Sequence, residues 1–218
     1  VWTNALTGLN ESTRAEITWS GLDAGMRTTT IRDLSMTTAI TRVHVPLLRV
    51  RAGLFPYLRI TPMTGARDLN VDMAGFSTMK ADGEVDLAVL LPEAGLGGVL
   101  QVRGVLEFES WSKPPVNGHF TVLIPELVLP TKFRFNDIRL ECTLDKDKLT
   151  IDSYTMEKPL YVETTGTVVL NWRKLSASRY TIQGFVKKGK TEQEIKLNGP
   201  LRDFMDLAKG DLSKLFSF

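Results

Sequence analysis

The residues best placed for acid–base chemistry are Glu107 and Glu109, which lie two positions apart in a strand-like pattern. At this spacing two side chains share one face of a strand and stand roughly 6 to 7 Å apart, between the separations used by retaining and inverting glycosidases. Gln101 and Arg103 fall on the same face, which is typical of a solvated surface with charge pairs between strands. We therefore interpret the two glutamates as surface residues.

Histidine and cysteine give no stronger sign of catalysis or of a metal site. His44 and His119 are the only histidines, and neither has a metal-binding or catalytic-triad motif around it. Cys142 is the only cysteine, so the chain has no internal disulfide and no thiolate cluster of its own. We expect both histidines to be ordinary strand residues. We predict no catalytic residue, no cofactor and no metal ion, and we predict that the protein is not an enzyme.

Three loops invite a ligand-binding interpretation that their neighbours do not support. The glycines within residues 92–98 precede a strand pattern, whereas a phosphate-binding loop needs a helix N-terminus. Residues 145–148 begin like a calcium loop but continue with a leucine at a ligand position, so we predict a hairpin turn. The basic residues at 187–190 are predicted to form a solvated hairpin tip, with weak attraction to anionic lipid as the alternative.

The length of 218 residues favours a single β-rich domain. The 27 basic and 25 acidic residues give a net charge of +2 and are spread along the chain, whereas a nucleic-acid-binding surface needs clustered basic residues. No apolar run approaches the ~20 residues that span a bilayer. The chain begins at Val1 without an initiator Met, so we expect either a fragment of a longer protein or a processed form that has lost a signal peptide or a membrane anchor.

Apolar and polar residues alternate from Glu84 to about Lys187, interrupted by turns. Such alternation predicts an antiparallel sheet with one dry face and one wet face. The fold class we predict is mainly β: a long curled antiparallel sheet, either a meander, an open barrel or a taco-like shape. Val85 to Leu91 alternates in the same way and predicts a strand.

Several places are predicted to interrupt or end this sheet. Pro46 predicts a bulge or an edge strand, and a change of phase at Asn136 and Asp137 predicts a β-bulge. Residues 54–58 predict a one-turn helix or hairpin cap. Residues 1–14 form a polar N-terminal segment. Residues 201–216 have the apolar spacing of an amphipathic helix, which is predicted to plug one end of the sheet or cover its edge, with a membrane or partner surface as the alternative.

The segments FRFNDIRLECTL, KLTIDSYTM, EKPLYVETTGTVVLNW and SRYTIQGFVK follow one another in this order. Together they resemble the closing part of the type II secretion system protein N family in its long-chain form and, more distantly, AsmA-like envelope proteins. Upstream, LLRVRAGLFPYLRI, NVDMAG and DGEVDLAVLL are similar to the same family. The resemblance covers about residues 15–188. It implies a periplasmic protein, tethered to the inner membrane by an N-terminal helix absent from this chain.

Two functions follow as hypotheses. The resemblance implies a non-enzymatic accessory or scaffold of type II protein secretion that contacts other envelope proteins, which fits exposed sheet edges. The alternative is a lipid-binding or lipid-transfer module that holds phospholipid in an apolar groove. The residues predicted to line that groove are Leu106, Phe120, Val122, Ile124 and Leu140.

A third hypothesis, a carbohydrate-binding β-sandwich, requires Trp19, Trp111 and Trp172 on one exposed face. Trp19 and Trp172 lie in phase with apolar neighbours, so we predict instead that they pack in the core.

Overall fold

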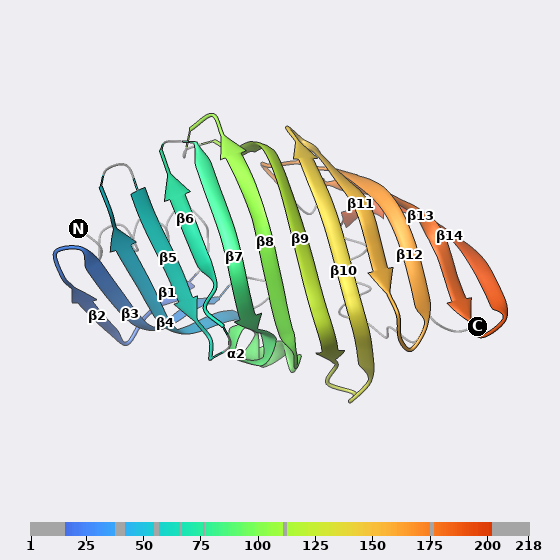
Figure 1. Ribbon diagram of the computed structural model, residues 1–218, viewed down its shortest axis with the longest axis horizontal. Coiled ribbons are helices and arrows are strands. Elements are labelled where there is room, and N and C mark those ends of the chain that lie inside the picture. Colours follow the sequence, from blue (N-terminus) through green and yellow to red (C-terminus); the bar gives the residue numbers. More distant parts are fainter. Residues whose placement is uncertain are drawn as a thin grey trace.

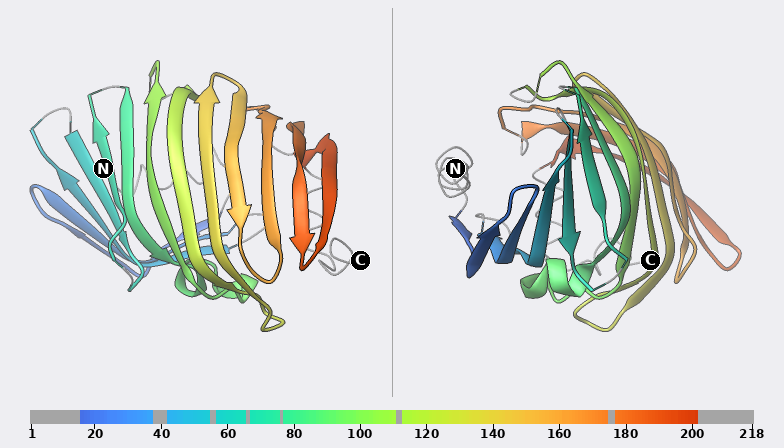
Figure 2. Two further views of the ribbon diagram at one scale, coloured as in Figure 1. Left: turned by 45° about the vertical axis from the view of Figure 1, so that its right-hand side comes forward. Right: turned by 60° about the vertical axis from the view of Figure 1, so that its left-hand side comes forward.

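The computed structural model describes residues 16–37, 42–54, 57–65, 67–75, 77–110, 113–174 and 177–201. These residues form one antiparallel sheet of 14 strands, in which consecutive strands are neighbours except that β1 and β2 both pair with β3 (Figure 1). The sheet is curled and is not closed into a barrel (Figure 2). The predicted fold class is therefore confirmed. The polar N-terminal segment and, apart from Leu201, the predicted C-terminal helix lie outside the described residues.

The strands of the first half are β1 (Glu16–Thr18), β2 (Gly21–Ala24), β3 (Thr28–Thr37), β4 (Arg42–Ala52), β5 (Tyr57–Met63), β6 (Asn70–Ala74) and β7 (Thr78–Asp86). A short helix, α2 (Leu87–Leu90), and a 3-10 turn, η1 (Pro92–Ala94), lead to the second half. Its strands are β8 (Val99–Phe108), β9 (Pro115–Val128), β10 (Arg134–Asp145), β11 (Lys148–Met156), β12 (Tyr161–Val169), β13 (Arg179–Lys188) and β14 (Thr191–Pro200).

The two faces of the sheet differ in polarity. Directly opposite residues of paired strands share a face, so each face can be followed as rows of residues across the strands. One row on the apolar face runs through Phe120, Cys142, Ile151, Gly166 and Ile182. The corresponding row on the polar face runs through His119, Thr143, Thr150, Thr167 and Thr181. The sheet is curled, so it has a concave and a convex side (Figure 2). A single-layer sheet can bury side chains deeply only on the side around which it curls, and the apolar rows include buried residues such as Val162 and Val186. We therefore assign the apolar face to the concave side and the polar face to the convex side.

Curvature lets the concave face bury part of its own surface. A packed cluster lies over β10 to β13 and consists of Phe135, Ile138, Met156, Leu160, Val162 and Val186. Full burial of an apolar side chain of this size contributes roughly 1.5 to 3 kcal/mol, so this cluster is a main source of stability for the second half. A smaller set of buried residues, including Ile31, Val50 and Val85, lies on β3, β4 and β7.

Two irregular places in the sheet share one arrangement, an aspartate with positive φ opposite a proline of a neighbouring strand. Asp33 (φ 51°) falls between the pairs that flank Pro46, and Asp137 (φ 54°) falls between the pairs that flank Pro125. Proline has no N–H to donate to the ladder, and aspartate tolerates the left-handed region better than most residues. The register between β3 and β4 is the same on both sides of Pro46, with Arg32 opposite Leu47 and Leu34 opposite Val45, so the predicted bulge is wrong. The predicted alternative of an edge strand is wrong, because β4 lies between β3 and β5.

The phase change in β10 takes a different form from the predicted one. Phe135 and Ile138 are both buried, so the alternation does change phase between them. The register with β9 is the same on both sides, however, with Asn136 opposite Glu126 and Ile138 opposite Ile124. Both strands therefore change phase together, and the predicted bulge with one inserted residue is wrong.

The strand predicted up to Leu91 ends early, at Asp86. The Asp86 side chain accepts a hydrogen bond from the N–H of Ala88 at 2.9 Å and begins α2. The backbone N–H of Asp86 donates to Thr64 Oγ1, also at 2.9 Å, which fixes the end of the strand. Helix α2 and η1 then contact β4, so this connection covers one end of the curled sheet.

Two further sequence interpretations need correction. Tyr57 and Leu58 already belong to β5, so the one-turn helix predicted at residues 54–58 is wrong there. The alternative prediction of a hairpin agrees with the antiparallel pairing of β4 with β5. Trp172 follows the end of β12 and is 38% exposed, with its indole N–H donating to the carbonyl of Lys146, so it is not a core residue. Trp111 lies outside the described residues.

Candidate functional site

The five predicted groove residues lie on three adjacent strands, with Leu106 on β8, Leu140 on β10, and Phe120, Val122 and Ile124 on β9. All five are half-buried. The register places Val122 between Val102 and Leu140, on the apolar side of the sheet. The structure thus brings these residues together on the concave face.

Two glycines lie directly opposite two of these side chains, where a Cβ would have no room. Gly104 is opposite Phe120, and Gly118 is opposite Leu106. A Cβ added to Gly104 would lie 2.5 Å from the Cβ of Phe120 and 2.8 Å from the carbonyl oxygen of His119, closer than real side chains approach. Because Gly104 and Gly118 have no side chains, β8 and β9 can approach each other closely next to Phe120 and Leu106.

The apolar surface extends beyond the five residues that sequence reasoning selected. It continues through half-buried residues of the flanking strands: Ile60, Val71, Met73, Met79 and Val102 toward the N-terminus, and Ile151, Tyr154 and Ile182 toward the C-terminus. The same period-two alternation marks most of these positions in the sequence. The register was needed to join them into continuous rows.

The two halves of this surface are filled to different degrees. Ile124 and Tyr154 pack against the buried cluster of Phe135, Ile138 and Met156, so the part of the face around that cluster is filled by its own side chains. Leu106, Phe120, Val122 and Leu140 are not members of that cluster. Among the described elements, the main contacts join neighbouring strands or join strands with α2 and η1, so no second described layer covers these four residues.

The concave face offers apolar contact and little reactive chemistry. Cys142, directly opposite Phe120, is 1% exposed. Burial and the negative charge of Asp152 raise the pKa of the Cys142 thiol to about 11, so the thiol stays protonated at neutral pH and is a poor nucleophile. Burial also raises the pKa of the Tyr154 hydroxyl. Side chains of this kind can hold an apolar ligand.

The acidic and histidine side chains considered for catalysis are dispersed. Glu107 lies on the convex face, and Glu109 follows β8, where Lys113 Nζ approaches its carboxylate at 2.7 Å and lowers its pKa. His44 on β4 contacts Ser35 Oγ at 3.1 Å, whereas His119 lies on β9, in a different part of the sheet. The described residues contain no group of three or more His, Cys, Asp or Glu side chains that could hold a metal ion.

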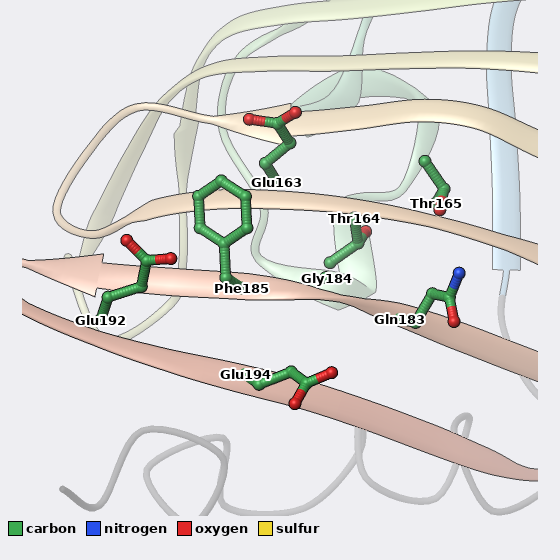
Figure 3. A pocket seen from close by; sticks show the side chains of 8 residues that line it. All are labelled: Glu163, Thr164, Thr165, Gln183, Gly184, Phe185, Glu192 and Glu194. Atoms are coloured by element: carbon green, nitrogen blue, oxygen red, sulfur yellow. The ribbon is translucent and has the colours of Figure 1, made fainter.

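A shallow hollow of about 570 Å³ lies on the convex face over β12, β13 and β14 (Figure 3). Three carboxylates border it, and each already has a partner. Glu163 accepts from the Tyr161 hydroxyl at 2.8 Å. Glu192 pairs with Lys187 at 3.0 Å, and Glu194 pairs with Lys196 at 2.8 Å. The hollow is therefore a surface of satisfied polar groups, and we assign it no ligand.

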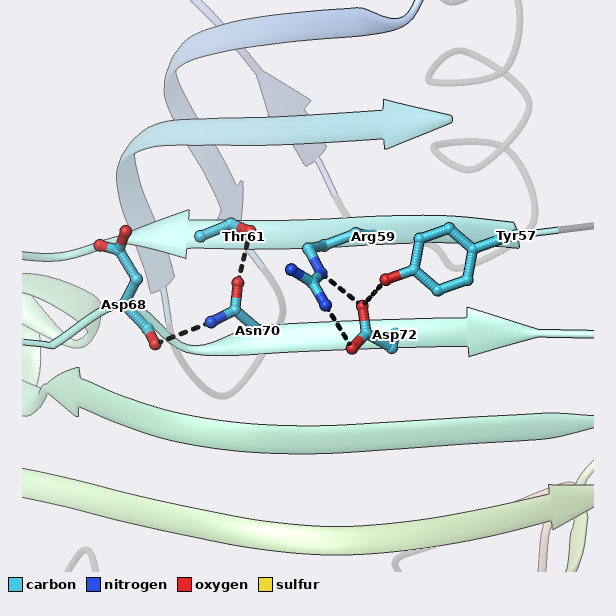
Figure 4. A network of polar contacts seen from close by, with 6 residues as sticks. All are labelled: Tyr57, Arg59, Thr61, Asp68, Asn70 and Asp72. Atoms are coloured by element: carbon cyan, nitrogen blue, oxygen red, sulfur yellow. Dashed lines mark hydrogen bonds and ion pairs between the residues drawn. The ribbon is translucent and has the colours of Figure 1, made fainter. Parts of the chain in front are cut away.

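The convex face of β5 and β6 carries a compact polar network (Figure 4). Arg59 makes two hydrogen bonds to the carboxylate of Asp72, and the Tyr57 hydroxyl donates a third at 2.6 Å. The Arg59 hydrogen bond is the main cause that lowers the pKa of Asp72. Thr61 donates to Asn70 on the same pair of strands. This network joins β5 to β6 and leaves the Asp72 carboxylate occupied.

Comparisons with protein-family models, with curated proteins and with solved structures each found no match. Among the described residues, no helix has the length and hydropathy required to cross a membrane. The function of the chain must therefore be inferred from its own surfaces.

Proposed function

We propose that this chain is a non-enzymatic lipid-binding module that holds acyl chains against its concave face. The observation that supports this most strongly is the half-buried apolar surface around Phe120 and Val122, over which no described layer packs. Apolar rows without charged side chains suit an acyl chain, because a hydrocarbon gains from leaving water and needs no hydrogen-bond partner.

The dimensions of the face suit a chain lying across the strands. The concave rows run from β5 to β13, and nine strands spaced ~4.8 Å apart span roughly 38 Å. The hydrocarbon core of a bilayer, which holds two layers of acyl chains, is about 30 Å thick. One extended acyl chain therefore covers about half of that thickness and fits within the width of the concave face. Because the cluster over β10 to β13 is already packed, we place the acyl chain over β7 to β10.

Protein purified from membranes and examined by native mass spectrometry tests this function. We expect copurified phospholipid with the wild-type chain, and less lipid with Val122→Asn, which puts an amide on the concave face. Leu123→Asn is the matched control, because Leu123 is the next residue of β9 and lies on the convex face opposite Gln101 and Arg139. Wild-type protein without lipid, or equal loss from both variants, contradicts the proposal.

A second candidate is the accessory role in type II protein secretion, in the periplasm and tethered to the inner membrane. It is supported by the sequence resemblance and by β14, a strand of 10 residues at one end of the sheet. Such an edge can pair with a strand of another envelope protein through its backbone. Deletion of the gene from a bacterium that carries both this protein and a type II secretion system tests this role: secretion of type II substrates should fall, and unchanged secretion would exclude it.

A further inference from the structure

Two large apolar side chains are exposed at the tips of neighbouring turns. Met26, between β2 and β3, is 105% exposed, and Leu54, after β4, is 93% exposed. The turns are adjacent because the N–H of Ala52 donates to the carbonyl of Arg27 at 2.9 Å. Both lie at one corner of the sheet, at the left of Figure 1. Single exposed apolar residues are common on protein surfaces, whereas two at one corner indicate a contact surface.

Arginine side chains gather next to these tips with few carboxylates to pair them. Arg51 on β4 is directly opposite Arg59 on β5, and like charges directly opposite each other destabilise the pairing of two strands. Arg49 lies two residues earlier on the same face of β4. The carboxylate of Asp72 is already bound by Arg59. Within the described residues, neither Arg49 nor Arg51 forms an ion pair.

The remaining charges near the corner do not cancel this excess. Arg27 is exposed in the same turn as Met26. Asp23 on β2 is opposite Thr30, which in turn is opposite Arg49, so Asp23 lies two strands away from that arginine and forms no ion pair with it. The corner therefore combines two apolar tips with positive charge that no described carboxylate pairs.

We infer that this corner docks the protein on the surface of an anionic membrane. Met26 and Leu54 enter the acyl region, and Arg27, Arg49 and Arg51 contact headgroup phosphates. Apolar tips beside basic residues are the combination that binds anionic bilayers. An acidic protein or a nucleic acid would satisfy the arginines but would leave both apolar tips without a matching surface.

Membrane docking goes beyond lipid binding on the concave face, and the geometry connects the two surfaces. Ala52, at the end of β4, begins a concave row that continues through Leu58, Met73 and Met79 and reaches Leu106. Docking at this corner thus brings the bilayer next to one end of a row that leads to the candidate lipid surface.

Vesicle flotation tests the inference, with phosphatidylcholine vesicles prepared with and without phosphatidylglycerol. Wild-type protein should bind the anionic vesicles preferentially and should release them at high salt. Arg49→Gln with Arg51→Gln should weaken binding roughly tenfold to thirtyfold. Met26→Ser with Leu54→Ser should also weaken it. Circular dichroism and thermal unfolding check that each variant is folded.

Matched controls change the same chemistry elsewhere. Lys188→Gln with Lys190→Gln removes two exposed charges, one at the end of β13 and one in the turn that follows it. Val169→Ser removes an apolar residue that is 51% exposed on β12. Both controls should bind like the wild type. The inference is overturned if wild-type protein ignores anionic vesicles, if neutral vesicles bind as well, or if the controls lose as much binding as the corner variants. The concave variant Val122→Asn should still bind vesicles, which separates docking from lipid binding.

Discussion

Arg59 holds Asp72 across the β5–β6 ladder with two parallel hydrogen bonds, Nε to Oδ1 at 2.6 Å and Nη2 to Oδ2 at 2.9 Å (Figure 4). This geometry is the strong bidentate form of an ion pair, although both side chains are partly exposed, at 41% and 26%. Exposure to solvent limits the contribution of this ion pair to the free energy of unfolding to roughly 1 kcal/mol.

The first prediction concerns the pH dependence of this pair. Arg59 lowers the pKa of Asp72 in the folded protein, so the pair stabilises the fold above the ordinary aspartate pKa of about 3.9 and loses that effect as pH falls below it. Urea unfolding should show Asp72→Asn to be about 1 kcal/mol less stable than wild type near neutral pH. The difference should shrink in acid. A difference that persists or grows in acid would contradict the assigned role.

A second prediction concerns the curvature of the sheet at Gly104. A Cβ at this position meets the backbone of the neighbouring strand, so Gly104→Ala should destabilise the protein by roughly 1 to 3 kcal/mol. Gly21→Ala is the control, because its new Cβ would come no closer than 3.8 Å to Arg32, an ordinary contact. Denaturant unfolding of the two variants measures the effect. Equal stabilities would mean that β8 and β9 do not approach each other as described.

A third prediction follows from the left-handed backbone of Asp137. Glycine adopts this conformation without strain, whereas a residue with a Cβ and no polar side chain costs roughly 1 to 2 kcal/mol. Asp137→Ala should therefore lower the free energy of unfolding, and Asp137→Gly should change it little. If the two variants were equally stable, the positive φ of 54° would be wrong.

A fourth prediction concerns the reactivity of Cys142. Its buried thiol, with a pKa raised to about 11, should react slowly with iodoacetamide at neutral pH and at the ordinary rate in denaturant. Rapid alkylation of the folded protein would show that this part of the concave face is open to solvent and reagent.

Alternation along the strands predicted the two faces of the sheet, because period two is a local property of an extended chain. It placed Phe120, Val122 and Leu140 on the apolar face, where the structure has them. It missed α2, since the hydrogen bond from Asp86 to Thr64, which ends β7, joins residues 22 positions apart. No local pattern reports such a contact.

The last strand was also missed, for a different reason. In β14 the apolar alternation is reduced to Ile195 and Leu197, and the charged residues Glu192, Glu194 and Lys196 occupy the other face. An edge strand has less surface to bury than a central one, so its sequence carries a weaker signal. The arginine corner was equally hidden, because only the register places Arg51 opposite Arg59.

Photocrosslinking with a phospholipid that carries a photoreactive group in its acyl chain tests the central claim most directly. Mass spectrometry of the labelled peptides should place the crosslinks on β8, β9 and β10, around Leu106, Phe120 and Val122, and Val122→Asn should reduce them while Leu123→Asn does not. Crosslinks spread over the convex face, or no crosslinks at all, would contradict an acyl-binding concave face.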